Sequence, residues 1–118
     1  KVKADTDVTD ADVASCALVL FGGPDSNAVT ARIADGLPAA VSGGKLTLRG
    51  KEYDESASAV RLIYPNPANP DRYVLLTWAL DPSANAALGT DLRHLPDWCV
   101  LGSEGNTIDA GFFDKDWK

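Results

Sequence analysis

The apolar positions of this chain fall into short runs separated by turn residues. The run Cys16 to Phe21 is continuously apolar, which is typical of a strand covered on both faces of a sheet. Tyr73 to Leu80 also has apolar side chains on both faces and is the strongest strand of the sequence. We therefore expect both segments to be buried central strands, with helices on the faces of the sheet.

A helix is predicted directly after the first of these strands. The turn 22–26 breaks the strand, either Asp25 or Ser26 is suited to cap a helix, and Gly36 with Pro38 ends it. The apolar face of this helix has a four-residue spacing, at Val29, Ile33 and Leu37. Strand, glycine turn and helix in this order open a doubly wound α/β unit.

Other elements follow from local patterns. Thr9 and Asp12 have the spacing of a capping box for a short helix, and alternation at Leu46 and Leu48 predicts a one-sided strand at a sheet edge. The remaining predictions are a strand at 60–64, a short helix at 85–94, and a final strand pair at 97–101 and 107–113. The predicted fold is a single three-layer α/β domain over 1–118, Rossmann-like or flavodoxin-like, whose mixed sheet has antiparallel edge strands.

The composition and net charge of the chain limit the kinds of partner that we expect. The 118 residues are enough for one core, and 11 basic against 17 acidic side chains give a net charge of −6. This charge disfavours nucleic acid as a partner, and no apolar run reaches the roughly 18 residues of a membrane span. The chain starts at Lys1 and contains no Met, so we expect a fragment or module of a larger protein.

The two cysteines leave two interpretations open. Cys16 and Cys99 each start an apolar run, and neighbouring strands would bring the thiols close enough for a disulfide. The alternative is two separate buried thiols. With His94 as the only histidine, the sequence contains no ligand-spaced pair, so we expect no metal and no cofactor.

The turn after the first strand is the first candidate site. A helix N-terminus offers free backbone donors to an anion, and the candidate ligand-binding residues are Gly22, Gly23, Asp25, Ser26 and Asn27. The turn matches neither the dinucleotide nor the P-loop spacing, and Pro24 removes a donor, so a plain tight turn is the alternative. No nucleophile elbow is present, and no catalytic residue is assigned.

A proline-rich segment from Tyr64 to Tyr73 is the second candidate. Its three prolines predict a stiff loop that ends the strand before it, and a stiff loop is close to its bound shape before binding. The candidate interaction rim consists of Tyr64, Asn66, Asn69 and Arg72. A rigid connection without a binding role is the alternative.

Three strings of this sequence resemble a known kind of domain. They are 17–27 (ALVLFGGPDSN), 63–74 (IYPNPANPDRYV) and 111–117 (GFFDKDW). Together they resemble the extra C-terminal domain of bacterial secreted serine hydrolases of the prolyl-oligopeptidase and α/β-hydrolase type. The resemblance implies an accessory role and a periplasmic or secreted location. It carries no catalytic residue over, because the catalytic groups of those enzymes lie in their separate hydrolase domain.

Two functions are therefore weighed. The favoured one is a non-catalytic interaction module that packs against or assembles a larger, hydrolase-like protein partner, with homo-oligomerisation also open. The alternative is a domain, enzymatic or not, that binds a small ligand or anion at 22–27. A module should expose an apolar patch, whereas a ligand domain should have a polar-lined pocket over the strand ends.

Overall fold

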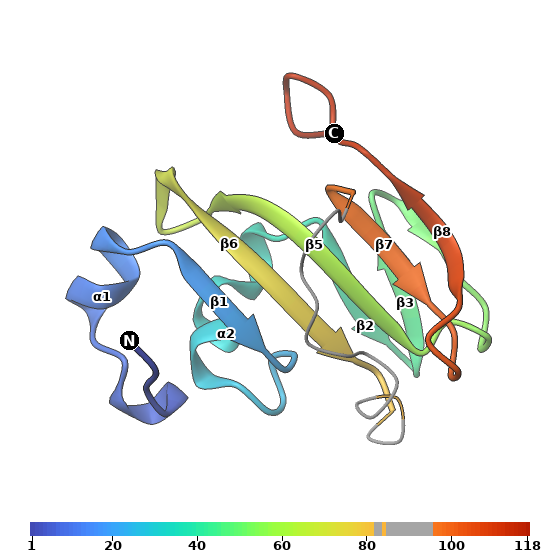
Figure 1. The fold of residues 1–118 in the computed structure, drawn as a ribbon, viewed down its shortest axis with the longest axis horizontal. Coiled ribbons are helices and arrows are strands. Elements are labelled where there is room, and N and C mark those ends of the chain that lie inside the picture. The colour runs from blue at the N-terminus through green and yellow to red at the C-terminus, as the bar shows by residue number, and fades with distance from the viewer. Residues whose placement is uncertain (82–83, 85–95) are drawn as a thin grey trace.

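The computed structural model describes residues 1–81, 84 and 96–118 (Figure 1). Within these residues strands predominate, at 40% of positions against 18% in helices. The helical elements are the α-helices α1 (Asp10–Ser15) and α2 (Ala28–Ile33) and the 3₁₀ turns η1 (Asp5–Asp7) and η2 (Ala34–Gly36). The strands are β1 (Leu18–Phe21), β2 (Ala39–Ser42), β3 (Lys45–Leu48), β4 (Lys51–Glu52), β5 (Ala59–Asn66), β6 (Asn69–Ala79), β7 (Trp98–Leu101) and β8 (Thr107–Gly111).

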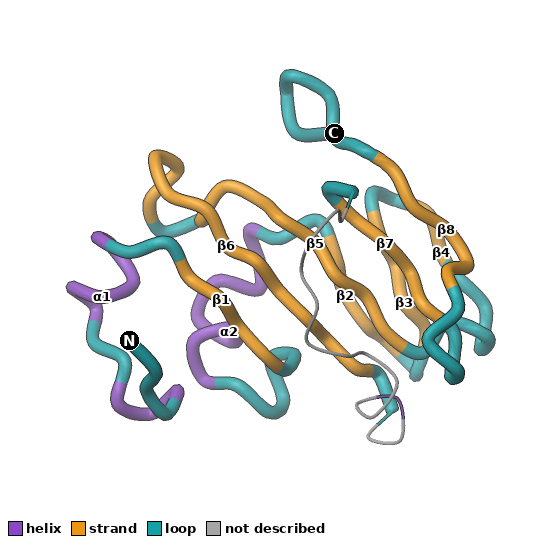
Figure 2. Tube along the Cα trace, in the orientation of Figure 1, coloured by secondary structure: helices purple, strands orange, loops and turns teal. Residues whose placement is uncertain are grey.

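The strands form two sheets. The larger has the order β1-β6-β5-β7-β8, with β1 parallel to β6 and every other pair antiparallel. The smaller has the order β2-β3-β4 and is antiparallel. Figure 2 shows the smaller sheet behind β5, β7 and β8, while α2 lies behind β1 and β6. The described part of the chain is therefore a large sheet backed on one face by a small sheet and a helix.

The core lies between the large sheet and these backing elements. Alternate residues of β5 and β6 point inward, and α2 and β3 face them with their apolar sides. The largest fully buried apolar side chains of the described residues are Val29, Leu46, Leu48, Val60, Leu62, Val74, Leu76 and Val100. The apolar spacing predicted for α2 is thus correct at Val29 and Ile33, which are buried.

The predicted three-layer α/β fold is wrong. The described residues make a mostly β domain with two sheets, and β1 is an edge strand rather than a central one. Leu20 of β1 is buried, whereas Val19 and Phe21 are 55% and 59% exposed. A continuous apolar run does not distinguish a strand buried on both faces from an edge strand with apolar residues on its open face.

Local predictions agree better with the structure. The capping box at Thr9 and Asp12 is present, since each residue's side chain bonds to the other's backbone N–H. The central strand β6 covers most of its predicted segment but begins four residues earlier, at Asn69, and its Leu76 is fully buried. The hairpin of β7 and β8 lies within its predicted segments. The strand at Leu46 and Leu48 has the predicted alternation, but it is the middle strand of the small sheet. The predicted helix at 85–94 lies outside the described residues.

The proline-rich segment is not a loop that stops the strand. β5 continues through Pro65 to Asn66, β6 begins at Asn69, and the two strands pair as a hairpin. Proline is tolerated here because β5 pairs with β7 only over 59–62, so that the end of β5 has an open side. Among the described residues, no helix has the length and apolar character needed to cross a membrane.

Candidate functional site

The turn predicted to bind an anion has its backbone donors occupied by the chain itself. Asn27, not Asp25 or Ser26, caps α2, and its Oδ1 accepts from the N–H groups of Val29 at 2.9 Å and Thr30 at 3.0 Å. The Asn27 N–H donates to the Gly23 carbonyl. The Ala28 N–H donates to the Asp5 carboxylate at 2.7 Å. The start of α2 therefore already holds an anion, supplied by the N-terminal segment.

Close packing accounts for the two glycines of this turn. Gly22 has a φ of 108°, a backbone conformation that other residues rarely adopt. A Cβ on Gly23 would lie 2.1 Å from Nε1 of Trp78, so only glycine fits beneath that indole ring. Ser26 makes only a weak 3.5 Å bond to the Gly23 carbonyl. The turn is thus explained as a packed connection between β1 and α2.

The asparagines of the predicted rim face inward. Asn66 is fully buried, and its side chain donates to the Val13 carbonyl at 2.8 Å and accepts from the Ala68 N–H. Asn69 donates to the Ala14 carbonyl. These carbonyls belong to the last turn of α1, where no further helical N–H is available to them. Asn66 and Asn69 therefore fix α1 to the β5–β6 hairpin, and of the predicted rim residues Arg72 alone is exposed.

The rim tyrosine Tyr64 belongs to an aromatic cluster that also contains Tyr73, Phe113 and Trp117. The Tyr64 ring meets Phe113 at 5.4 Å and Trp117 at 5.9 Å between centroids, both edge to face. Trp117 also lies 5.6 Å from Tyr73 and 5.8 Å from Phe113. The hairpin of β5 and β6 and the C-terminal segment meet in this aromatic cluster.

Arg49 extends the aromatic cluster with a cation. Its guanidinium carbon lies 5.1 Å from the ring centre of Trp98 and 5.9 Å from that of Phe113, within the range of cation–π attraction. Arg49 and Gly50 form the two-residue turn between β3 and β4, with φ of 54° and 79°. Both positive φ values match a type I′ hairpin, which favours Asn-Gly. An arginine at the first position therefore holds an unfavourable backbone conformation.

A hollow of about 320 Å³ opens beside these rings. Its lining residues come from four separate parts of the chain: Pro38, Arg49, Tyr64, Trp117 and Lys118. Arg49 and Trp117 are the two non-glycine residues with positive φ among the described residues. Backbone strain of this kind is concentrated at functional sites. Two strained residues in the lining of one hollow mark it as the candidate site.

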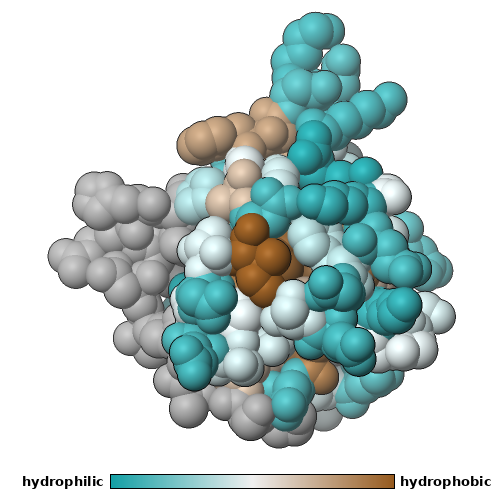
Figure 3. All heavy atoms as spheres, turned by 90° about the vertical axis from the view of Figure 1, so that its right-hand side faces the viewer, coloured by the Kyte–Doolittle hydropathy of each residue, from teal (hydrophilic) through white to brown (hydrophobic). Residues whose placement is uncertain are grey.

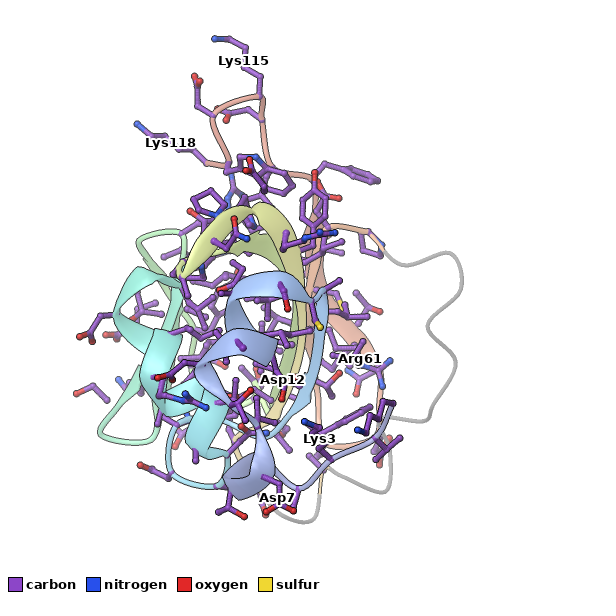
Figure 4. All side chains as sticks on the ribbon, turned by 90° about the vertical axis from the view of Figure 1, so that its left-hand side faces the viewer. Lys3, Asp7, Asp12, Arg61, Lys115 and Lys118 are labelled. Carbon is purple, nitrogen blue, oxygen red and sulfur yellow. The ribbon has the colours of Figure 1, made fainter. Side chains whose placement is uncertain are left out.

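The C-terminal turn 114–118 holds Trp117 in place. Asp114 Oδ1 accepts from the N–H groups of Asp116 at 2.8 Å and Lys118 at 3.0 Å, and these bonds hold the pKa of Asp114 below its usual value. Figure 4 shows Lys115 and Lys118 extending from this turn beyond the body of the domain. The turn therefore combines a fixed indole ring with exposed cationic side chains.

Charge at the hollow is dominated by Arg49. Among the described residues no carboxylate forms an ion pair with its guanidinium. Asp114 interacts electrostatically with both Arg49 and Lys118, and the backbone hydrogen bonds that lower its pKa keep it ionised, so it offsets part of their positive charge. The exposed guanidinium of Arg49 thus lies against two rings, and among the described residues it forms no ion pair.

The surface shows where the domain is apolar. On the face seen in Figure 3, the darkest brown side chains form a small central group, with tan side chains above it and hydrophilic side chains over much of the remaining described surface. That face carries no broad apolar patch of the kind expected for an interaction module. The exposed large apolar side chains of the described residues include Val19 and Phe21 on β1 and Tyr73 of the aromatic cluster.

The cysteines are free thiols, Cys16 exposed and Cys99 buried. Cys16 precedes β1 and Cys99 lies in β7, with β6 and β5 between these strands. Three strand spacings of about 4.8 Å exceed the roughly 7 Å that separates the α-carbons of a disulfide. The thiols therefore do not meet within one chain. No group of three or more potential metal-ligating side chains occurs in the described residues.

Comparison with known proteins adds no assignment: no family model, curated protein or solved structure matches this chain. The assignment of the candidate site is therefore based on its geometry alone. The sequence identified the segment from Tyr64 to Tyr73 as a candidate, but it gave no role to Arg49. Two sequence signals pointed to the other residues of the site: Arg-Gly at a hairpin turn that favours Asn-Gly, and the aromatic-rich segment 112–117.

Proposed function

We propose that this domain is a non-catalytic interaction module and that it recognises a segment of a partner protein in the hollow between Arg49, Tyr64 and Trp117. The observation that carries the proposal is the convergence of two strained residues and an aromatic cluster on one opening. Aromatic and arginine side chains are the residues that dominate binding energy at protein interfaces. Rings already packed against one another lose little freedom on binding, which favours affinity.

The turn at 22–27 does not support the competing function. Its helix donors are bonded within the chain, and the glycines serve packing. A ligand there would have to displace the Asp5 carboxylate. The resemblance to accessory domains of secreted hydrolases favours a hydrolase domain as the partner, and a periplasmic or secreted location. The free thiols add no support for that location.

A peptide library displayed on phage tests the proposal. The folded domain is the target, and Arg49→Gln and Tyr64→Ala domains serve for negative selection after thermal unfolding has shown that they fold. We expect enriched peptides that bind the wild-type domain and bind both variants at least tenfold more weakly. Peptides that bind wild type and variants equally, or no enrichment above an unrelated domain, would overturn the proposal.

Arg72→Gln is the matched control for this selection. Arg72 is an exposed arginine on β6 next to Tyr73, and it does not line the hollow. Its substitution removes the same charge at a nearby position. We expect affinity for the selected peptides to stay within about twofold of wild type, since Arg72 does not line the hollow and its charge is exposed to solvent. A loss equal to that of Arg49→Gln would indicate general electrostatic attraction rather than recognition in the hollow.

A further inference from the structure

We infer that the segment recognised in the hollow is acidic, with a carboxylate placed next to an aromatic ring. The inference rests on the proposed function and specifies the chemistry of its partner. It follows from three properties of the lining: an oriented guanidinium, a wall of rings, and a volume that suits a single ring-bearing residue with its neighbour.

The guanidinium of Arg49 provides the recognition of a carboxylate. The two rings below it, Trp98 and Phe113, hold its plane without using its N–H donors. A planar fork of donors matches the two oxygens of a carboxylate, and such charge-assisted pairs are stronger than neutral hydrogen bonds. No carboxylate among the described residues forms an ion pair with Arg49, so its guanidinium can form one with the carboxylate of a ligand.

The rings of Tyr64 and Trp117 provide the recognition of an aromatic group. They meet edge to face, so each leaves apolar surface toward the hollow that they both line. The hollow of about 320 Å³ lies at the lower end of the usual size of small-ligand pockets. It therefore suits one planar side chain rather than a folded element of a partner.

Charge complementarity also favours an acidic partner segment. The charged residues that line the hollow, Arg49 and Lys118, are both cationic, within a chain of net charge −6. Asp114 does not line the hollow, but it interacts electrostatically with both cations and offsets part of their charge. The charged side chains in the lining itself are thus cationic, which favours an acidic segment over a basic one.

The experiment compares two peptides that differ only in charge. Acetylated and amidated Gly-Glu-Phe-Gly and Gly-Gln-Phe-Gly are titrated into the ¹⁵N-labelled chain, with the indole N–H of Trp117 and the side-chain N–H of Arg49 as reporters. We expect saturable shifts of both signals with the Glu peptide and at least tenfold weaker binding of the Gln peptide. A charge-assisted pair is worth about 1.5–3 kcal/mol, which corresponds to at least that factor.

Variants locate the carboxylate on Arg49. Arg49→Gln should lower the affinity for the Glu peptide at least tenfold and leave the affinity for the Gln peptide unchanged. Arg49→Lys should restore part of the difference in affinity between the two peptides. Lys45→Gln is the control, because Lys45 is an exposed lysine of the small sheet that pairs with Glu52 at 3.6 Å, and it should change neither affinity.

The outcomes separate this inference from the proposed function. Equal affinity of the two peptides, or no binding of the Glu peptide at about 10 mM, overturns the acidic partner. The proposed function then stands if the library selection still yields neutral peptides that depend on Arg49 and Tyr64. Failure of the library selection overturns the proposed function itself.

Discussion

Two adjacent residues at the start of α2 have different roles. Asn27 accepts from two backbone N–H groups, whereas the hydroxyl of Ser26 is exposed and makes one weak bond. Asn27→Ala should therefore lower the free energy of unfolding by about 1 kcal/mol, and Ser26→Ala by less than about 0.5 kcal/mol. Urea unfolding followed by circular dichroism measures both. Equal effects would contradict the assignment of Asn27 as the cap.

The same comparison shows what sequence reveals at the scale of single residues. The capping box at Thr9 and Asp12 was predicted correctly because both partners lie within one helical turn. At α2 the predicted cap was off by one or two positions, since Asp25, Ser26 and Asn27 all have side chains that can cap. The bond from Ala28 to Asp5 joins residues 23 positions apart, and no local spacing predicts such a contact.

At the scale of elements, β6 and β1 differ in burial. Leu76 of β6 is fully buried, whereas Val19 of β1 is more than half exposed. Leu76→Ala should lower the free energy of unfolding by about 2–5 kcal/mol, as truncations in packed cores do. Val19→Ala should cost less than about 0.5 kcal/mol. Chemical denaturation compares the two variants, and a large cost at Val19 would place β1 inside a covered sheet after all.

A buried hydroxyl links the segment after the small sheet to the large one. Tyr53 donates to Asp109 of β8 at 2.8 Å, and Lys51 of β4 binds the same carboxylate at 3.0 Å. Burial first, and then the bond to Asp109, raises the pKa of Tyr53 from 10.0 to about 12. The connection therefore persists while Tyr53 stays protonated.

This shift predicts an alkaline loss of stability. The folded chain holds the Tyr53 proton more tightly than the unfolded chain, so its contribution is full below pH 10 and is lost as pH rises toward 12. In Tyr53→Phe, this loss between pH 10 and 12 should disappear. Asp109→Asn should lower the pKa of Tyr53, which absorbance of tyrosinate measures. An unchanged titration in Asp109→Asn would show that the two side chains do not interact.

Secondary-structure elements were predicted correctly where the local sequence pattern was sufficient. The hairpin of β7 and β8 has apolar segments around a glycine-rich turn, and β6 is a long apolar run. What the sequence did not reveal was the order of strands. The order of strand, glycine turn and helix suggested a doubly wound sheet, yet the segment between β1 and β6 also supplies the small sheet that backs the large one.

At the scale of the whole molecule, the two thiols should react in separate steps. Cys16 is exposed, while Cys99 is buried and burial raises the pKa of its thiol. Without reductant, one thiol should react rapidly with a chromogenic disulfide reagent in the native protein, and the second only after unfolding in guanidinium. Cys16→Ser should abolish the rapid step. Absence of reactive thiols in the unfolded protein would instead establish a disulfide.

The candidate site is also a property of the whole molecule. Arg49 comes from a hairpin turn, Tyr64 from β5, and Trp117 from the C-terminal turn. Each of these segments has an ordinary local explanation, so their convergence follows only from the tertiary fold. Sequence reasoning identified the Tyr64 to Tyr73 segment as unusual, but it assigned an outward role to the two asparagines that bind α1.

The position of β1 at the sheet edge also has a consequence for how the chain folds. β5 and β6 form a hairpin whose partners are close in sequence, whereas β1 must find Val74 to Thr77 across a long intervening segment. The entropy lost in closing so long a loop makes this pairing slow to form. The hairpin should therefore fold first and β1 should dock last. The amide protons of β1 should then exchange with solvent earlier than those of β5, because β1 can open locally at the edge of the sheet.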